Sequence, residues 1–177
     1  NILEKEKFDY FINLGTTNRY FISKVLADVK KNIKFKKDYY IFSRFLEKKN
    51  TKNYSFTRKI ANVFFIKLTR ILTQTYFTDP GSSTVIMKNI FFKKIKKLNY
   101  SQITNGSHFT HFFNILVYKN NSNVQEIPII WREGNVKSHL KSGSYVVILF
   151  FSLIKFRLTN KFFNEKKNNF KFSEFNF

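Results

Sequence analysis

The sequence predicts an α/β domain in which helices flank a mixed, mostly parallel sheet. Short apolar runs of strand length alternate along the chain with longer segments whose apolar residues recur at helical spacing. Apolar residues make up 43% of the 177 positions, which is enough to build the core of one domain. Only 5 Gly and 2 Pro interrupt the chain, so most of it should lie in regular elements.

The first third of the chain predicts two strands with a helix between them. Residues 8–14 form a short apolar and aromatic run that stops at a Gly-Thr-Thr-Asn loop, which is typical of a buried strand. Residues 20–31 place apolar side chains at helical spacing with lysines opposite them, as in an amphipathic helix. Residues 38–42 predict a second strand, which ends at Ser43 and Arg44.

The middle of the chain predicts a loop, a long helix, a tight turn and a strand. Residues 47–55 are rich in Lys and Asn and are expected to form a mobile loop. Residues 56–75 predict a long helix with its basic side chains outside. Residues 78–83 carry the strongest turn signal, because Pro fixes one backbone dihedral and Gly frees another. A short strand over 84–87 and a short basic helix over 89–98 follow. The apolar positions of the long helix are Ile60, Val63, Phe64, Ile66, Leu68, Ile71 and Leu72.

The last third predicts two helices around an edge strand. Residues 107–118 are aromatic and favour a helix packed on the sheet. Residues 124–131 predict an edge strand, since their internal proline cannot donate to a central ladder. Residues 142–158 predict an amphipathic to apolar helix. The stretch 160–177 has no clear period and is expected to be a basic, mobile tail beyond a single domain over 1–159.

The charge of the chain predicts attraction to polyanions. Lys and Arg number 32 against 11 acidic residues, a net charge of +21. Nucleic acid, an anionic bilayer surface and phosphorylated substrates are all consistent with this charge. Codon usage in an AT-rich genome would also raise Lys, Asn, Ile, Phe and Tyr together. The absence of Cys excludes disulfides and Cys nucleophiles.

Four segments resemble, in order and rough spacing, the family 2 glycosyltransferases of the polyprenyl-phosphate type. Residues 8–12 are similar to the strand that leads into that family's acidic metal motif, and 41–46 to its Gly-Ser-Arg strand end. Residues 78–83 resemble the acidic turn before its acceptor-side strand. Residues 125–133, running into 138–141, resemble its Glu-Val-Pro-Ile strand and basic closing loop, and are the most specific of the four.

The resemblance implies the later part of a GT-A fold over residues 1–159, without the family's first strands. It also implies sugar transfer from a nucleotide-sugar donor to a polyprenyl phosphate, a glycan or another membrane-associated acceptor. The family uses a divalent cation, Mg²⁺ or Mn²⁺, held through an Asp-x-Asp motif. This chain has Gly15, Thr16 and Thr17 at that place, and Thr hydroxyls cannot supply the same charge. No metal ligand is therefore assigned.

Two candidate site regions are the tight turn after the long helix and the end of the second strand. Asp79 is the candidate catalytic residue, because a carboxylate there can accept or orient the acceptor proton; Asp before Pro-Gly is also a common turn former. Gly81 and Ser82 can present backbone N–H groups to a phosphate. Ser43 and Arg44 end a strand where ligand crevices form, and a guanidinium there can hold a diphosphate through two hydrogen bonds.

The basic stretch after the edge strand is the third candidate region. Its cations would stabilise the charge that grows on a departing diphosphate. In a chain this basic, lysines also occur in loops by chance. His108 and His111 stand three apart, but no third ligand is nearby, so no metal site is assigned to them. The candidate substrate-binding residues of the stretch are Arg132, Ser138, His139 and Lys141.

The helix expected over 145–158 predicts peripheral contact with a membrane surface. Its apolar run is flanked by Lys155 and Arg157, as in helices that lie in a bilayer interface, although core packing explains the run equally well. The longest uncharged apolar run, 145–154, is shorter than the ~20 residues that a spanning helix needs. The expected location is cytoplasmic, at or near a membrane surface.

Three functional hypotheses follow from the sequence. The first is a family 2 glycosyltransferase. The second is a catalytically degenerate remnant or partner subunit of that family, which the residues at positions 15 and 17 favour. The third is a nucleic-acid-binding protein of the ribosomal type, suggested by the charge and the interleaved aromatic residues but ranked last, since no RNA-binding motif is present.

Overall fold

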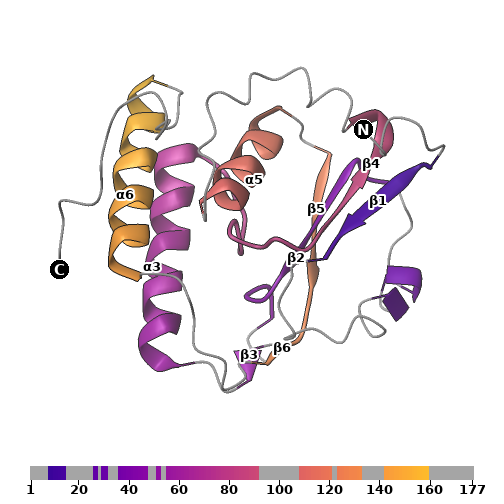
Figure 1. The fold of residues 1–177 in the computed structure, drawn as a ribbon, viewed down its shortest axis with the longest axis horizontal. Helices are drawn as coiled ribbons and strands as arrows, with labels where there is room; N and C mark the ends of the chain where they lie inside the picture. Colours follow the sequence, from indigo (N-terminus) through magenta and orange to yellow (C-terminus); the bar gives the residue numbers. More distant parts are fainter. Residues whose placement is uncertain are drawn as a thin grey trace.

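A four-stranded sheet with helices beside it forms the body of the protein (Figure 1). The computed structural model describes residues 8–14, 26–27, 29–31, 36–47, 51–52, 55–91, 108–120, 123–132 and 142–159. The sheet has the strand order β1-β4-β2-β5. The strands are β1 (Tyr10–Asn13), β2 (Tyr39–Ser43), β4 (Val85–Lys88) and β5 (Val124–Pro128).

The direction of β4 makes the sheet mixed. β2 and β5 pair in parallel, whereas β4 pairs antiparallel with both β1 and β2. β1, β2 and β5 therefore run the same way, but two of the three ladders are antiparallel, which corrects the expectation of a mostly parallel sheet. The cause is the turn at residues 78–83, which lies by the end of β2: the chain that leaves it runs back along β2, and the Phe42 N–H donates to the Thr84 carbonyl at 3.0 Å.

A second, two-stranded sheet corrects the prediction of a loop over 47–55. β3 (Thr51–Lys52) pairs in parallel with β6 (Trp131–Arg132). The partner strand lies some eighty residues away in the sequence, so no local pattern could indicate it. The predicted edge strand is confirmed for β5, which lies at one edge of the sheet. β5 ends at Pro128, and Trp131, the last residue of the predicted strand, belongs to β6.

Three helices match the predicted ones within a few residues. They are α3 (Phe56–Thr73), α5 (Phe109–Asn120) and α6 (Ser142–Thr159). α3 ends where Gln74 adopts a left-handed backbone (φ 55°) and donates its N–H to the Arg70 carbonyl at 2.8 Å. The predicted helices over 20–31 and 89–98 are helical at 26–27, 29–31 and 89–91, and their other residues lie outside the described part.

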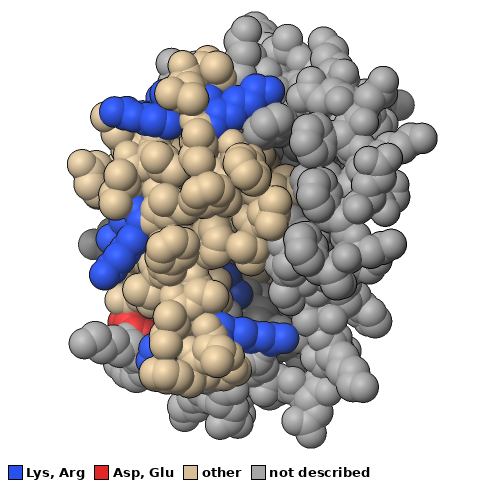
Figure 2. Space-filling view, turned by 90° about the vertical axis from the view of Figure 1, so that its left-hand side faces the viewer, with Lys and Arg blue, Asp and Glu red and all other residues tan. Residues whose placement is uncertain are grey.

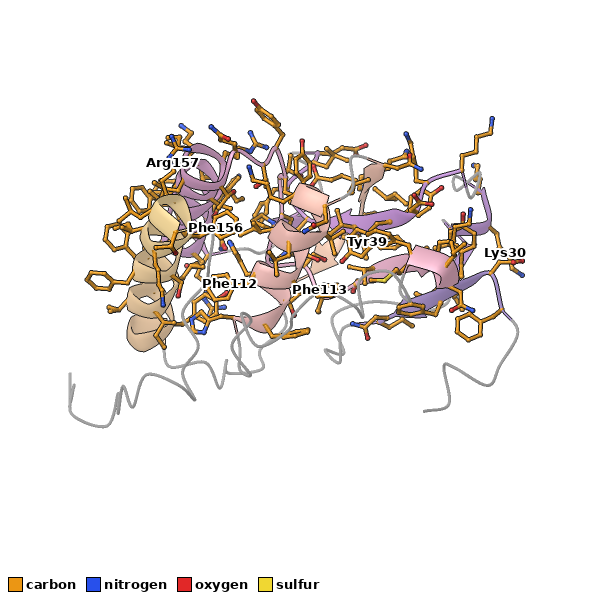
Figure 3. All side chains as sticks on the ribbon, turned by 90° about the horizontal axis from the view of Figure 1, so that it is seen from above. Lys30, Tyr39, Phe112, Phe113, Phe156 and Arg157 are labelled. Atoms are coloured by element: carbon orange, nitrogen blue, oxygen red, sulfur yellow. The ribbon has the colours of Figure 1, made fainter. Side chains whose placement is uncertain are left out.

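Helix α5 connects the sheet to the pair formed by α3 and α6. Phe113 lies towards Tyr39 of β2, with the ring centroids 6.4 Å apart, and Phe112 belongs to the cluster that includes Phe156 of α6 (Figure 3). α3 and α6 also pack against each other. The core is thus continuous from the sheet through α5 to the outer helices.

The outer face of α3 departs from the prediction. Leu68 and Leu72 pack in the core as expected, but Ile60, Phe64 and Ile71 are exposed. The apolar stripe of α3 is wide, so the sequence pattern does not decide which part of the stripe is buried; packing against α6 decides it. Among the described helices, none has the length and apolarity needed to cross a membrane.

Candidate functional site

The turn at residues 78–83 lies against the end of β2 and beside β5. The hydroxyl of Ser43, the last residue of β2, lies 2.5 Å from the Thr78 hydroxyl, and the two share a hydrogen bond. Inside the turn, the Ser82 N–H donates to the Asp79 carbonyl at 3.1 Å. Because the ends of β1, β2 and β5 point to the same edge of the sheet, the turn sits where α/β proteins bind ligands.

Arg44 and Asp79 form a two-point ion pair at this edge. The Nε of Arg44 donates to Oδ2 of Asp79 at 2.7 Å, and its Nη2 donates to Oδ1 at 2.7 Å. The backbone N–H of Arg44 adds a third bond to Oδ2 at 3.1 Å. The Asp79 side chain is 2% exposed and that of Arg44 16%. Parallel bonds of this kind fix both the distance and the plane of the guanidinium.

Glu126 of β5 holds the first half of the turn. Its Oε1 accepts the Thr78 N–H at 2.8 Å, the Thr78 hydroxyl at 2.9 Å and the Asp79 N–H at 3.2 Å. Burial raises the pKa of Glu126 above its ordinary value; the bonds from Thr78 and Asp79 oppose this rise, and the Asp79 carboxylate adds to it. Glu126 was not among the predicted site residues, although an acid in a strand of so basic a chain was a usable signal.

Asn114 of α5 holds the second half of the turn. Its Nδ2 donates to the carbonyls of Pro80 at 2.7 Å and Ser82 at 2.9 Å, and its Oδ1 accepts the Tyr39 hydroxyl at 2.5 Å. Burial raises the pKa of Tyr39 far above its ordinary value, so its hydroxyl stays protonated and donates. The turn is therefore clamped by a carboxylate on one side and an amide on the other.

Two histidines lie behind the turn. Nε2 of His111 shares a hydrogen bond with the Thr69 hydroxyl at 3.1 Å. Burial, with a smaller contribution from His108, lowers the pKa of His111 to about 3, so the ring is neutral at pH 7. His108 donates from Nε2 to the Tyr145 carbonyl at 2.9 Å and stacks on the Tyr145 ring at 4.2 Å. Both rings thus serve the packing of α5 against α3 and α6.

Tyr145 at the start of α6 lies near the ion pair. Burial raises the pKa of its hydroxyl; the Arg44 guanidinium opposes this rise and the Asp79 carboxylate adds to it. The hydroxyl is therefore protonated at pH 7 and able to donate. The surroundings of Arg44 and Asp79 thus include a neutral hydrogen-bond donor from α6, a helix far along the chain from both.

Some of the predicted site residues lie close together at the turn, and the side chains of the others are not among those that the structure describes. The turn and the end of β2 bring together Ser43, Arg44, Asp79, Gly81 and Ser82. Arg132 lies in β6, where only the backbone is described, and Ser138, His139 and Lys141 fall outside the described residues, as do positions 15–17.

Two details of the turn differ from the sequence-based expectation. Gly81 does not use a left-handed backbone, and an added Cβ would lie at an ordinary 3.7 Å from Nδ1 of His111. The Ser82 N–H, expected to face a phosphate, donates to the Asp79 carbonyl. The Ser82 hydroxyl is buried and finds no hydrogen-bond partner among the described residues.

The described carboxylates do not fit Mg²⁺ or Mn²⁺. No group of three or more His, Asp or Glu side chains converges in the part of the chain that the structure describes. The oxygens of Asp79 are engaged by Arg44, and one oxygen of Glu126 is engaged by Thr78 and Asp79. The site therefore offers a fixed guanidinium, a buried carboxylate behind it and a neutral phenol, an arrangement suited to binding anionic oxygens.

No protein-family model matches the chain, and no curated protein matches it.

Proposed function

We propose that the chain is part of a family 2 glycosyltransferase with a GT-A fold. It would transfer a sugar from a nucleotide-sugar donor to a polyprenyl phosphate or another membrane-associated acceptor. One observation carries the proposal: three of the four segments that resemble the family meet in a single network. Arg44 comes from the segment 41–46, Asp79 from 78–83 and Glu126 from 125–133.

Arg44 is the proposed diphosphate contact. In sugar transfer, the bond from the anomeric carbon to the donor diphosphate breaks while the acceptor oxygen bonds to that carbon. The diphosphate leaves with the bonding electron pair, so its negative charge grows in the transition state. A guanidinium that is already oriented stabilises this charge without reorganising. Arg44 lies at the edge of the sheet where such a ligand would approach.

Asp79 is the proposed positioning residue. Both of its oxygens accept from the Arg44 side chain, and the carboxylate is almost fully buried. That geometry suits holding the guanidinium in place more than reaching the acceptor hydroxyl as a base. Glu126 and Asn114 act one step further away, since they fix the backbone of the turn that carries Asp79.

Nucleotide binding by the double variant R44Q/D79N tests the proposal. The double change replaces the ion pair with two neutral amides and leaves no unpaired buried charge. Calorimetry with UDP, GDP and their sugar derivatives should show binding to the wild-type protein and a loss of roughly tenfold or more in the variant, because a charge-assisted bond is removed. Lys119→Gln, which removes one positive charge from the exposed end of α5, is the matched control. Absence of binding by the wild-type protein, or equal affinities, would contradict the proposal.

A second candidate function is that of a catalytically degenerate partner subunit with the same fold. It is favoured by Gly15 and Thr17 at the place of the family's metal-binding acids. The double variant G15D/T17D separates the two functions. Metal-dependent hydrolysis of a sugar nucleotide that appears only in the variant would support the degenerate subunit. Turnover by the wild-type protein without added metal would exclude it.

A further inference from the structure

An exposed apolar stripe follows the whole outer length of α3. Phe56, Ile60, Phe64 and Ile71 recur at the spacing of one helical face, and Val63 lies beside them. All five are exposed, Phe56 by 75%. Leu68 and Leu72 continue the row of Ile60 and Phe64 at four-residue spacing, and they pack in the core. α3 therefore has one wide apolar stripe, and the fold buries only the side of it that carries Leu68 and Leu72.

α6 repeats this arrangement. Leu149, Leu153 and Phe156 are buried against α3 and α5. On the other side of the helix, Val147, Phe151 and Leu158 are exposed, Leu158 by 78%. A helix that is apolar all round belongs in a large core or in contact with lipid. α6 lies at the outer edge of the molecule, next to α3 (Figure 1).

The charged residues of these two helices are all positive. α3 carries four, Arg58, Lys59, Lys67 and Arg70, and α6 carries Lys155 and Arg157; neither helix contains Asp or Glu. Figure 2 faces this side of the molecule and shows a broad, mostly uncharged surface with Lys and Arg around it and an acidic group at its lower left edge. Lys67 lies within the α3 stripe itself, where a lysine can spread its methylene chain over apolar surface and extend its ammonium group outward.

We propose that the exposed stripes of α3 and α6 form one surface that lies on an anionic lipid bilayer. The Phe, Ile, Val and Leu side chains enter the boundary between headgroups and acyl chains, and the flanking Lys and Arg contact lipid phosphates. No part of this surface belongs to the Arg44–Asp79 network, so the inference does not rest on sugar transfer. If the proposed function also holds, the surface brings the protein to the layer in which a lipid-phosphate acceptor resides.

A bilayer fits this surface better than nucleic acid does. Nucleic acid offers phosphates and base faces to cations and aromatic rings, but it does not match rows of Ile, Val and Leu. An anionic bilayer offers an apolar interior directly beneath a layer of negative charge. The apolar stripes match the interior of the bilayer, and the Lys and Arg around them match its negatively charged layer.

Vesicle binding by two matched variants tests the proposal. Ile71 of α3 is 72% exposed and Ile90, next to β4 and outside the proposed surface, is 69% exposed. Ile71→Ser and Ile90→Ser thus remove the same side chain at nearly the same exposure. Co-sedimentation with phosphatidylcholine vesicles containing phosphatidylserine should show about fivefold weaker binding for Ile71→Ser and unchanged binding for Ile90→Ser. Adding Leu158→Ser to Ile71→Ser should weaken binding further.

A charge-reversal variant and a measurement of self-association complete the test. Lys67→Glu should reduce binding to vesicles with phosphatidylserine and have little effect on vesicles of phosphatidylcholine alone. Circular dichroism of each variant shows that it remains folded. Equal loss in Ile71→Ser and Ile90→Ser, or no vesicle binding by the wild-type protein, would overturn the proposal. So would a dimer in sedimentation velocity that Ile71→Ser dissociates, because a second copy of the chain would then cover the surface.

Discussion

At the scale of single residues, the pair of Arg44 and Asp79 shows how two separate candidates become one unit. In the sequence each has its own proposed role, one as a cation for phosphate and the other as an acid. In the structure Arg44 and Asp79 bond to each other, and a third residue, Glu126, accepts the backbone N–H of Asp79. A substitution at one position therefore changes the environment of the others.

Removal of Arg44 alone should destabilise the protein strongly. Arg44→Ala leaves the Asp79 carboxylate buried without its cation, and breaking a buried pair in this way costs roughly 3 kcal/mol. The double variant R44A/D79N should recover part of the loss, since no buried charge is left. Urea denaturation of the wild-type protein, both single variants and the double variant measures the coupling. Additive losses would show that the two side chains do not interact in solution.

Ionisation of Glu126 should make stability depend on pH in an unusual direction for an acid. Its pKa is raised above the ordinary value of 4.5, so its contribution to stability is complete below pH 4.5 and is lost as pH rises through the folded-state pKa. Glu126→Gln keeps an acceptor oxygen for Thr78 but cannot ionise. Thermal melting from pH 4.5 to 7 should show this loss in the wild-type protein and not in the variant. An identical pH profile would mean that Glu126 has an ordinary pKa.

Ionisation of His111 should make stability depend on pH in the opposite direction, with the loss on the acid side. Its folded-state pKa is lowered to about 3 from 6.5, so its contribution to stability is complete above pH 6.5 and is lost as pH falls towards 3. His111→Gln should be less stable at pH 7, where the bond to Thr69 is perturbed, but should lose less stability between pH 6.5 and 4. Calorimetric melting of both proteins across this range measures the difference. A steeper acid loss in the variant would contradict the buried, neutral ring.

At the scale of the elements, α3 separates what periodicity predicts from what packing selects. Its apolar residues form one wide stripe, and the helical pattern places Ile60 and Leu68 in the same row. Contacts with α5 and α6 bury Leu68 and leave Ile60 exposed. The sequence therefore predicts the helix correctly, but it does not predict which of its apolar residues are buried.

Alanine substitutions at buried and exposed positions of the α3 stripe should differ in cost. Leu68→Ala removes a side chain from the cluster shared with α6 and should cost about 2 kcal/mol. Ile60→Ala removes an exposed side chain and should change the free energy of unfolding by less than about 0.5 kcal/mol. Chemical denaturation of both variants measures the contrast. Similar costs would show that the outward stripe is covered when the protein is alone in solution.

At the scale of the whole molecule, the topology follows from where the chain turns. The turn at residues 78–83 sits beside the end of β2, so β4 must leave it in the reverse direction and separate β1 from β2. β5 then adds in parallel on the other side of β2. Segments that are distant along the chain thereby reach one edge of the sheet, where Arg44, Asp79 and Glu126 meet.

The α/β fold class and most of the helices and strands could be predicted from the sequence alone. Short apolar runs placed the strands that became β1, β2, β4 and β5, and longer apolar or amphipathic segments placed the helices that became α3, α5 and α6. Residue type also marked Arg44 and Asp79 as candidates, since a cation at a strand end and an acid in a Pro-Gly turn are local features.

Which segments contact one another became known from the tertiary structure alone. The reversed direction of β4, the pairing of β3 with β6, the hold of Glu126 on the turn and the outward face of α3 each depend on contacts between segments that are far apart in the sequence. Local propensity carries no information about such contacts, because their free energy arises only when both segments have been brought together by the rest of the fold. The helices and strands of this protein follow from local sequence, whereas the candidate site forms only when distant segments pack together.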